Sequence, residues 1–530
     1  MPVPSVASAV VEEPALSGSP PRVSTEEARA TWALVLACAL VLLPRLVVFP
    51  WSENLYGDAA IRTELAQRWL VSPHWISHMD DGAYQFGPLH LYLVAGALAL
   101  GVDREDAGRW VSLLFGVLTV LPLWSLTRRL AGIAGAWWAV AGLALWGMHI
   151  QMSTTAGSES VGLFLVLWCL ALFAEGVDEN RFAPLFGSAM VLNLACAVRY
   201  DCWMLVPLLA VLLYLGDKDR VAAITRGTFY LLLALPFPLL WMQGNEQAKG
   251  DPFAPIHYIE SFHRGWVADG VGRWGSLGYR AQNLVFWPGV ALLTLSPLIA
   301  WFGMRGMVRA WKSLPEYRWV IWVALVPTAY YAFRSVVLLD FVPLARFAVT
   351  QVALLLPFVG LGYQRTVEGG SMPARRAWAA AALLLAVATP LTIGVLTFRR
   401  DDSVASSLRP VSPVSTNPPA VMQVAHWLKA EVAPVGGSAV LDIDPSYWDL
   451  QIAFFSGLPD TQLSRIRWDI FRKQLAQQRP SVMVRREGGE LEKQPDFLQQ
   501  GDTVSFDGDG WEEVPGFQSP WHVYRRAGTR

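Results

Sequence analysis

Seven ionisable side chains stand at or near the ends of long apolar runs, and their types could act together on a phosphorylated substrate. They are Asp58, Glu159, Arg199, Asp201, His263, Arg264 and Arg346. A carboxylate can take a proton from a hydroxyl group, and cationic side chains can bind a phosphate. We therefore treat the acids Asp58 and Glu159 as catalytic candidates and the other five residues as candidates for substrate binding.

Each of these residues also has an ordinary structural explanation. Asp58 or Glu159 could cap a helix, and Arg199 could form a simple ion pair with Asp201 in a turn. His263 could simply be a solvated side chain, as histidines in polar loops usually are. Arg346 could reach with its charged group to the membrane surface while its stem stays in the apolar layer. Acids and bases gathered near one membrane face more often mark a shared cavity, which is the interpretation we favour.

The elements that must position these groups are membrane helices, because the composition is that of a chain embedded in a bilayer. Hydrophobic residues make up 53% of the 530 residues and charged residues 16%, and there are 25 Trp. The charges form short clusters between long apolar runs. A net charge of −1 gives no indication of nucleic-acid binding. The four cysteines lie in or beside apolar runs, so we expect neither a disulfide framework nor a cysteine-based metal site.

A crossing helix needs roughly 20 apolar residues and at least about 17, and we predict eleven membrane spans, whose ends could shift by a few residues where the apolar segment is short. They are 31–49, 110–126, 133–150, 160–176, 184–198, 202–215, 228–243, 284–303, 319–333, 347–362 and 377–397, with several of them short. The apolar stretch 88–101 is shorter and begins just after Gly87. We expect it to form a re-entrant or interfacial helix.

Basic residues decide the predicted orientation. If 88–101 does not cross, the basic loops all fall on one side of the membrane: Arg128 and Arg129; Lys218, Arg220 and Arg226; Arg305, Arg309, Lys312 and Arg318; Arg365, Arg375 and Arg376. That is the positive-inside pattern. It predicts a multi-pass protein of the inner (plasma) membrane with a cytoplasmic N-terminus. The C-terminus and all seven candidate residues then lie outside.

The predicted fold is mainly α: a polytopic bundle of about 11 transmembrane helices with juxtamembrane helices, followed by a small extracytoplasmic α/β domain. We divide the chain into a disordered cytoplasmic leader (1–30), a transmembrane domain (31–400), a linker (401–420) and the C-terminal domain (421–530). Alternating helices and strands indicate the α/β class of that domain: 421–432 and 468–478 as helices, 438–443 and 481–485 as strands. Trp448, Trp511 and Trp521 are expected to pack in its core, although sugar stacking is conceivable.

This set of residues fits glycosyl transfer from a lipid phosphate. Asp58 is the natural base for an acceptor hydroxyl. Arg346, Arg264 and Arg199 are natural partners of the phosphate that leaves with the lipid. Glu159 could orient the acceptor or share a divalent metal ion with Asp58, but two carboxylates distant in sequence do not by themselves indicate a metal site.

The order and spacing of the motifs resemble the GT-C superfamily of glycosyltransferases, and within it the ArnT and protein O-mannosyltransferase-like group (glycosyltransferase family 39 type). The resemblance covers residues 31–400. The segments that carry it are Gly57-Asp58, Gln85–Tyr92 with its Gly-Pro-Leu sequence, Arg109, the basic pair Arg128-Arg129, Ala156–Glu159, Arg199–Pro207 and Leu344–Phe347.

The resemblance implies a mannosyltransferase-like enzyme that takes a sugar from a polyprenyl- or dolichyl-phosphate donor and transfers it outside the cytoplasm with inversion. It implies Asp58 as the base, Glu159 as a second acid and Arg346 as a phosphate contact. The expected partners are the lipid-linked donor, an acceptor that is a glycolipid, a cell-wall glycan or a protein, and membrane lipids.

The sequence departs from this family in two places. Ala59 follows Asp58 where many relatives have Glu, and Phe86-Gly87 stands where some relatives have an acid–Lys pair. Metal use and a lysine–phosphate contact are therefore left open, with Asp80 or Asp81 able to supply the missing acid.

Two other functions compete with a transferase. A transporter or flippase of lipid-linked saccharides would be expected to show internal repeats and charges at the membrane midplane, whereas no repeat is evident and the ionisable groups gather at one face. A scaffold whose exported domain binds a glycan or a partner protein is the third possibility. The sequence specifies neither the sugar nor the acceptor.

Overall fold

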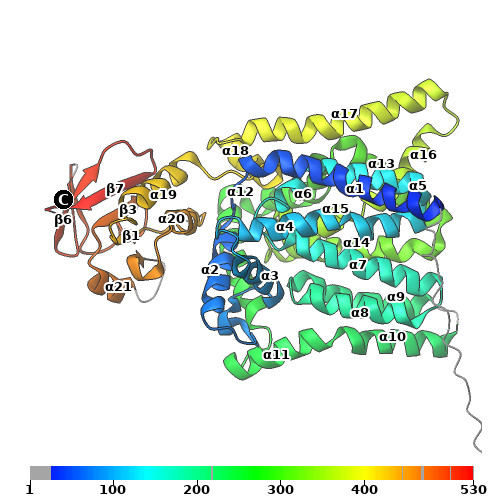
Figure 1. Ribbon diagram of the computed structural model, residues 1–530, viewed down its shortest axis with the longest axis horizontal. Helices are drawn as coiled ribbons and strands as arrows, with labels where there is room; N and C mark the ends of the chain where they lie inside the picture. The colour runs from blue at the N-terminus through cyan, green and yellow to red at the C-terminus, as the bar shows by residue number, and fades with distance from the viewer. Residues whose placement is uncertain (1–24, 217–218, 445, 467–470, 502, 529–530) are drawn as a thin grey trace, which may run out of the picture.

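The computed structural model describes residues 25–216, 219–444, 446–466, 471–501 and 503–528. Long helices lie side by side in a bundle, and a smaller part containing a β-sheet packs at one end of it (Figure 1). The predicted fold class, a helical membrane bundle with a small C-terminal α/β domain, is confirmed. Most of the predicted leader, 1–24, lies outside the described residues.

The bundle and the segments that adjoin it contain eighteen helices among the described residues. These are α1 (Thr25–Val48), α2 (Gly57–Val71), α3 (Pro88–Ala99), α4 (Ala107–Leu118), α5 (Val120–Leu145), α6 (Gly147–Met152), α7 (Glu159–Asp178), α8 (Phe182–Cys196), α9 (Leu205–Gly216), α10 (Arg220–Ala234), α11 (Pro236–Lys249), α12 (Ala254–Leu295), α13 (Pro297–Ser313), α14 (Arg318–Ala332), α15 (Val349–Ala353), α16 (Val359–Val367), α17 (Met372–Thr397) and α18 (Ser403–Leu408). Short 3-10 or π turns lie between them: η1 (Phe49–Trp51), η2 (Met79–Ala83), η3 (Tyr200–Met204), η4 (Pro315–Tyr317), η5 (Phe333–Leu338), η6 (Ala345–Ala348), η7 (Leu356–Phe358) and η8 (Arg409–Val411).

By length and composition, six helices among the described residues could cross a membrane, or eight if each of two bent pairs is one span. Each of the eleven predicted segments overlaps one of these or the shorter apolar helices 182–196 and 200–216. The prediction of one continuous helix over 284–303 is wrong. α12 and α13 meet there at 117°, because Ser296 has a positive φ of 73° and Pro297 offers no backbone N–H to continue the helix.

Two features depart from straight membrane-spanning helices: a break inside α5 and the short helix α3. Gly132 interrupts α5 with φ 69° and ψ −175°, a conformation that a residue without Cβ adopts at little cost. It separates the predicted segments 110–126 and 133–150. α3 is only 12 residues long and packs against α2 and α4, at the end of the bundle that carries the sheet (Figure 1). It is too short to span the membrane, as predicted for 88–101.

The C-terminal domain contains one seven-stranded sheet in the order β2-β1-β3-β7-β6-β5-β4. β1 pairs in parallel with β2 and β3, and the remaining neighbours are antiparallel. The strands are β1 (Ala439–Leu441), β2 (Leu463–Arg465), β3 (Val482–Arg486), β4 (Leu498–Gln500), β5 (Thr503–Phe506), β6 (Asp509–Val514) and β7 (Trp521–Arg526). Its helices are α19 (Pro419–Glu431), α20 (Trp448–Ser456) and α21 (Phe471–Gln478), with the turn η9 (Asp460–Gln462). Trp511 and Trp521 are each 1% exposed and belong to the core.

The domain rests directly on α2. Ala60 packs in one buried cluster with Ala425, Phe454 and Phe455. The Arg465 side chain is 4% exposed and lies 3.4 Å from Glu64 of α2, measured from Nη2 to Oε1. α2 is therefore held between the membrane bundle and the sheet domain (Figure 1).

Candidate active site

Asp58 lies in the first turn of α2, where its carboxylate meets an arginine from the far half of the chain. α2 begins at Gly57 after Tyr56, whose φ of 74° and ψ of 138° turn the chain sharply. Arg346 belongs to η6, and its Nη1 lies 2.6 Å from Oδ2 of Asp58. The Asp58 side chain is 28% exposed and the Arg346 side chain 21%. The pair is therefore partly shielded from water, and the carboxylate remains within reach of a substrate.

Glu159 opens α7 and is fixed by a second arginine. Arg199 Nη1 lies 2.8 Å from Oε1 of Glu159, and Arg199 Nε lies 3.0 Å from Oδ1 of Asp201. The stem of Arg199 passes so close to α7 that a methyl group on Gly162 would come within 2.7 Å of its Cδ. Arg199 is therefore occupied by two carboxylates, and it supports Glu159 rather than offering a free cation.

Arg346 connects the two ion pairs. It interacts electrostatically with both Asp58 and Glu159, although it forms its hydrogen bond only with Asp58. The structure thus brings five of the seven predicted residues into one cluster: Asp58, Glu159, Arg199, Asp201 and Arg346. Asp58 and Glu159 come from the first turns of α2 and α7, where the helix dipole favours negative charge, and Asp201 comes from η3.

The other two predicted residues have different surroundings. His263 is 3% exposed and its ring stacks on Phe341 with centroids 4.6 Å apart. Its Nδ1 accepts the backbone N–H of Val342 at 3.0 Å, so it supports the loop that leads to Arg346. Arg264 does not join the cluster, since its side chain is 71% exposed and approaches Glu260 of its own helix at 3.8 Å. A residue that follows a buried one in a helix commonly faces away from it.

One arginine of the site was missed by the sequence analysis. Arg62 lies one helical turn after Asp58 and is 7% exposed. Its guanidinium carbon sits 3.8 Å from the centre of the Phe86 ring. Its Nη1 is buried without a hydrogen-bond partner, and within the described ranges no carboxylate lies at ion-pair distance from it. The spacing of four residues from Asp58, which places both on one helix face, was the signal that could have found it.

Burial lowers the pKa of Arg62 to about 10, although Asp58 and Glu159 favour its charged form. The side chain therefore remains a cation at neutral pH. A buried cation without a hydrogen-bonded partner is costly, and an anion that binds beside it would relieve that cost. The cluster thus combines three carboxylates, Asp58, Glu159 and Asp201, with one occupied, one shared and one unsatisfied arginine.

Comparisons with known proteins support one superfamily. Residues 85–241 match the family model of dolichyl-phosphate-mannose-protein mannosyltransferases. Direct comparison with curated proteins gives no match. Among solved structures, ArnT from Cupriavidus metallidurans bound to undecaprenyl phosphate is similar with a TM-score of 0.58 and 14% identity, over 93% of this chain and 98% of that one. Oligosaccharyltransferase AglB from Archaeoglobus fulgidus, in complex with an inhibitory peptide and a dolichol-phosphate, is similar with a TM-score of 0.51 and 15% identity, over 87% and 70%.

The match to the family model and the shared fold support the resemblance to the GT-C superfamily predicted from the motifs. The segment that matches the family model includes Glu159, Arg199 and Asp201, whereas Asp58 and Arg346 lie outside it. The part played by each residue thus has to be argued from the geometry of the site.

The sequence analysis left open whether Asp58 and Glu159 share a divalent metal ion. Among the residues that the structure describes, no group of three or more His, Cys, Asp or Glu side chains could hold one. Asp58 and Glu159 are each paired to an arginine. We therefore derive no step through a metal ion.

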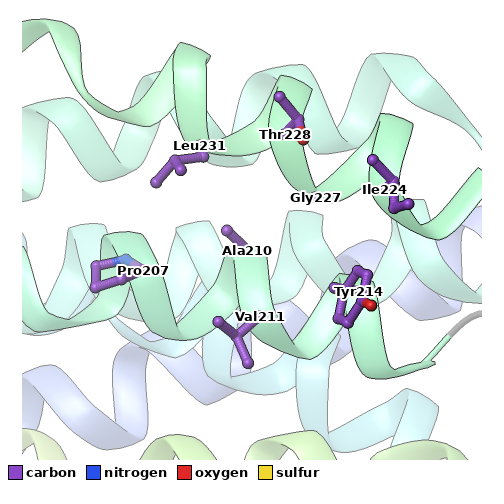
Figure 2. Close-up of a pocket in the computed structure, with 8 residues that line it drawn as sticks. All are labelled: Pro207, Ala210, Val211, Tyr214, Ile224, Gly227, Thr228 and Leu231. Carbon is purple, nitrogen blue, oxygen red and sulfur yellow. The ribbon is translucent and has the colours of Figure 1, made fainter.

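A groove on the helix bundle lies between α9 and α10 and has a volume of about 310 Å³ (Figure 2). Its walls carry no charged side chain: they are Pro207, Ala210, Val211, Tyr214, Ile224, Gly227, Thr228 and Leu231. Such a surface offers neither a carboxylate base nor a cation for a phosphate. The ionisable cluster at the end of α2 and α7 is therefore the candidate active site.

Proposed function

We propose that the chain transfers one sugar from a polyprenyl-phosphate donor to the hydroxyl group of an acceptor on the extracytoplasmic face of the plasma membrane. Asp58 takes the proton of that hydroxyl while its oxygen forms a bond to the anomeric carbon. The bond from that carbon to the phosphate oxygen breaks, and its electron pair leaves with the lipid phosphate. Attack from the side opposite the phosphate inverts the anomeric centre.

The observation that carries this proposal is the Asp58–Arg346 ion pair with the unsatisfied Arg62 one turn away on α2. A base and two cations in one partly buried cluster are what the reaction needs, because negative charge develops on the departing phosphate. Arg62 and Arg346 bind that phosphate in the proposed mechanism. Glu159, held by Arg199, supplies a fixed negative charge that keeps Arg346 between the two acids.

The same ion pair suggests an order of events. Arg346 donates a hydrogen bond to Asp58 and so engages the carboxylate. A donor phosphate competes with Asp58 for that guanidinium. Donor binding therefore frees the base at the moment when it is needed, and in the absence of donor Asp58 stays neutralised.

The experiment compares wild type with Asp58→Asn in proteoliposomes that contain a radiolabelled polyprenyl-phosphate sugar and cell-envelope acceptors. We expect transfer to fall by about 10²- to 10⁴-fold, the usual contribution of a general base. Asp106→Asn is the matched control, because Asp106 pairs with Arg109 at 2.5 Å outside the cluster. Unchanged transfer in Asp58→Asn would remove Asp58 as the base. Movement of the labelled lipid across the membrane without consumption of acceptor would instead identify a flippase.

A further inference from the structure

Five aromatic side chains form a continuous row that begins beside the proposed base. Tyr258, Phe262 and Trp266 follow one another along one face of α12, with neighbouring ring centroids 5.0 and 6.4 Å apart. Tyr84, just after η2, extends the row at one end, with its ring centroid 5.5 Å from that of Tyr258. Tyr447 of the sheet domain joins it from the opposite side, 6.5 Å from Phe262 and 6.4 Å from Trp266. We call these five residues the aromatic row.

The row adjoins Asp58 through the turn that carries Tyr447. A methyl group on Gly57 would lie 3.4 Å from Cβ of Tyr447, and Gly57 directly precedes Asp58. α12 and α20 lie where the bundle joins the sheet domain (Figure 1).

The row is not a sealed hydrophobic core. None of its five side chains is fully buried, and Tyr258 is 37% exposed. Two of its members carry phenol groups that hydrogen-bond to each other, Tyr84 Oη to Tyr258 Oη at 2.9 Å. Aromatic side chains with an accessible ring and a polar tip suit ligands that present both apolar faces and hydroxyl groups.

We propose that the aromatic row binds a sugar ring of the acceptor and so holds the neighbouring hydroxyl group at Asp58. The proposal rests on the proposed function, in which Asp58 deprotonates that hydroxyl. One face of a pyranose ring exposes C–H groups that can lie on an aromatic ring, while its hydroxyl groups can bond to Tyr84 and Tyr258. An aliphatic chain could use the rings but not the paired phenols, and this favours a glycan-bearing acceptor.

Tyr447 gives the sheet domain a direct part in this site. The Tyr447 ring lies on one side of the row, against Phe262 and Trp266 of α12. The proposal therefore assigns to the C-terminal domain the choice of acceptor, and leaves the donor phosphate to Arg62 and Arg346 of the bundle.

The test measures binding of mannotriose, maltotriose and chitotriose to the full-length protein in nanodiscs by saturation-transfer NMR. We expect at least one of these probes to bind wild type. Tyr258→Ala and Tyr447→Ala should each weaken that binding about tenfold, equivalent to about 1.4 kcal/mol. Tyr258→Ala guards against misfolding, because Tyr258 is 37% exposed and its ring contacts are with Tyr84 and Phe262 of the bundle. Tyr214→Ala is the matched control, since Tyr214 is 51% exposed and lies in the groove between α9 and α10.

Asp58→Asn separates this proposal from the proposed function. It should lose transfer but still bind the probe, because the row itself is unchanged. The proposal is overturned if no probe binds wild type, or if both row variants bind as wild type does. It is also overturned if transfer proceeds to a sugar-free peptide or lipid with KM values that the row variants do not alter. Each of those results would leave Asp58 as a base to be judged by its own experiment.

Discussion

Replacing Asp58 by asparagine should abolish transfer and yet strengthen binding of the lipid phosphate. In wild type the phosphate must compete with Asp58 for Arg346, whose Nη1 lies 2.6 Å from the carboxylate. Two unit charges about 4 Å apart attract by about 4 kcal/mol at an effective dielectric constant of about 20. The side chains are 28% and 21% exposed, so solvent screens part of that energy. A net value of about 1.5–3 kcal/mol, typical of hydrogen bonds to charged groups, is the better guide.

That energy corresponds to an affinity gain of about tenfold to hundredfold for undecaprenyl phosphate in Asp58→Asn. Calorimetric titration of the purified protein in nanodiscs measures it directly. Asp106→Asn should show no gain, because the Asp106–Arg109 pair lies elsewhere. The double variant Asp58→Asn with Arg346→Gln should lose the gain. If Asp58→Asn binds the lipid phosphate no better than wild type, Arg346 is not shared between Asp58 and phosphate, and the proposed order of events is wrong.

Three further outcomes are expected. Arg62→Gln should weaken binding of undecaprenyl phosphate by about 1.5–3 kcal/mol in calorimetry, whereas Arg264→Gln, which alters an exposed side chain, should leave it unchanged; equal losses would refute the assignment. Gly162→Ala should cost about 1–3 kcal/mol of stability, because its methyl group would overlap the stem of Arg199, and an unaltered thermal midpoint would contradict this. Arg465→Gln leaves a carboxylate of α2 without its cation, so limited proteolysis should cleave the link to the sheet domain faster than in wild type.

Much of the bundle follows from the sequence because membrane spans are set by local composition. Apolar length alone places helices such as α7 and α17, since every backbone group in a bilayer must be bonded within its own helix. The break at Ser296 was missed for the same reason. A hydrophobic run such as 284–303 carries the same apolar signal whether or not a proline inside it bends the chain.

The charged cluster was only partly predictable. Asp58 and Arg346 were identified because each stands at the edge of an apolar run, but their pairing joins positions 288 apart and depends on how the helices pack. Arg62 was missed because it is one of several charged residues in α2, with Glu64 and Arg68, and the sequence does not show which of them is buried. Arg264 was grouped with the site because its segment was expected to be a loop. The segment is part of α12, on which the Arg264 side chain is 71% exposed.

The sheet domain was the least predictable part. β1 and β3 were expected from their runs of apolar residues, whereas β4 to β6 carry many polar side chains. β5 shows why: its burial alternates from residue to residue, which gives a weak signal over four positions. Tertiary pairing in the sheet, rather than local preference, selects these strands.

The placement of α2 between two bodies has a consequence for recombining this protein with its relatives. The helix that carries Asp58 and Arg62 makes ionic and apolar contacts with the sheet domain through Glu64 and Ala60. A chimaera that exchanges only the C-terminal domain would therefore join mismatched surfaces on the helix that carries Asp58. The natural unit of exchange is the domain together with α2, even though more than 300 residues of bundle separate them along the chain.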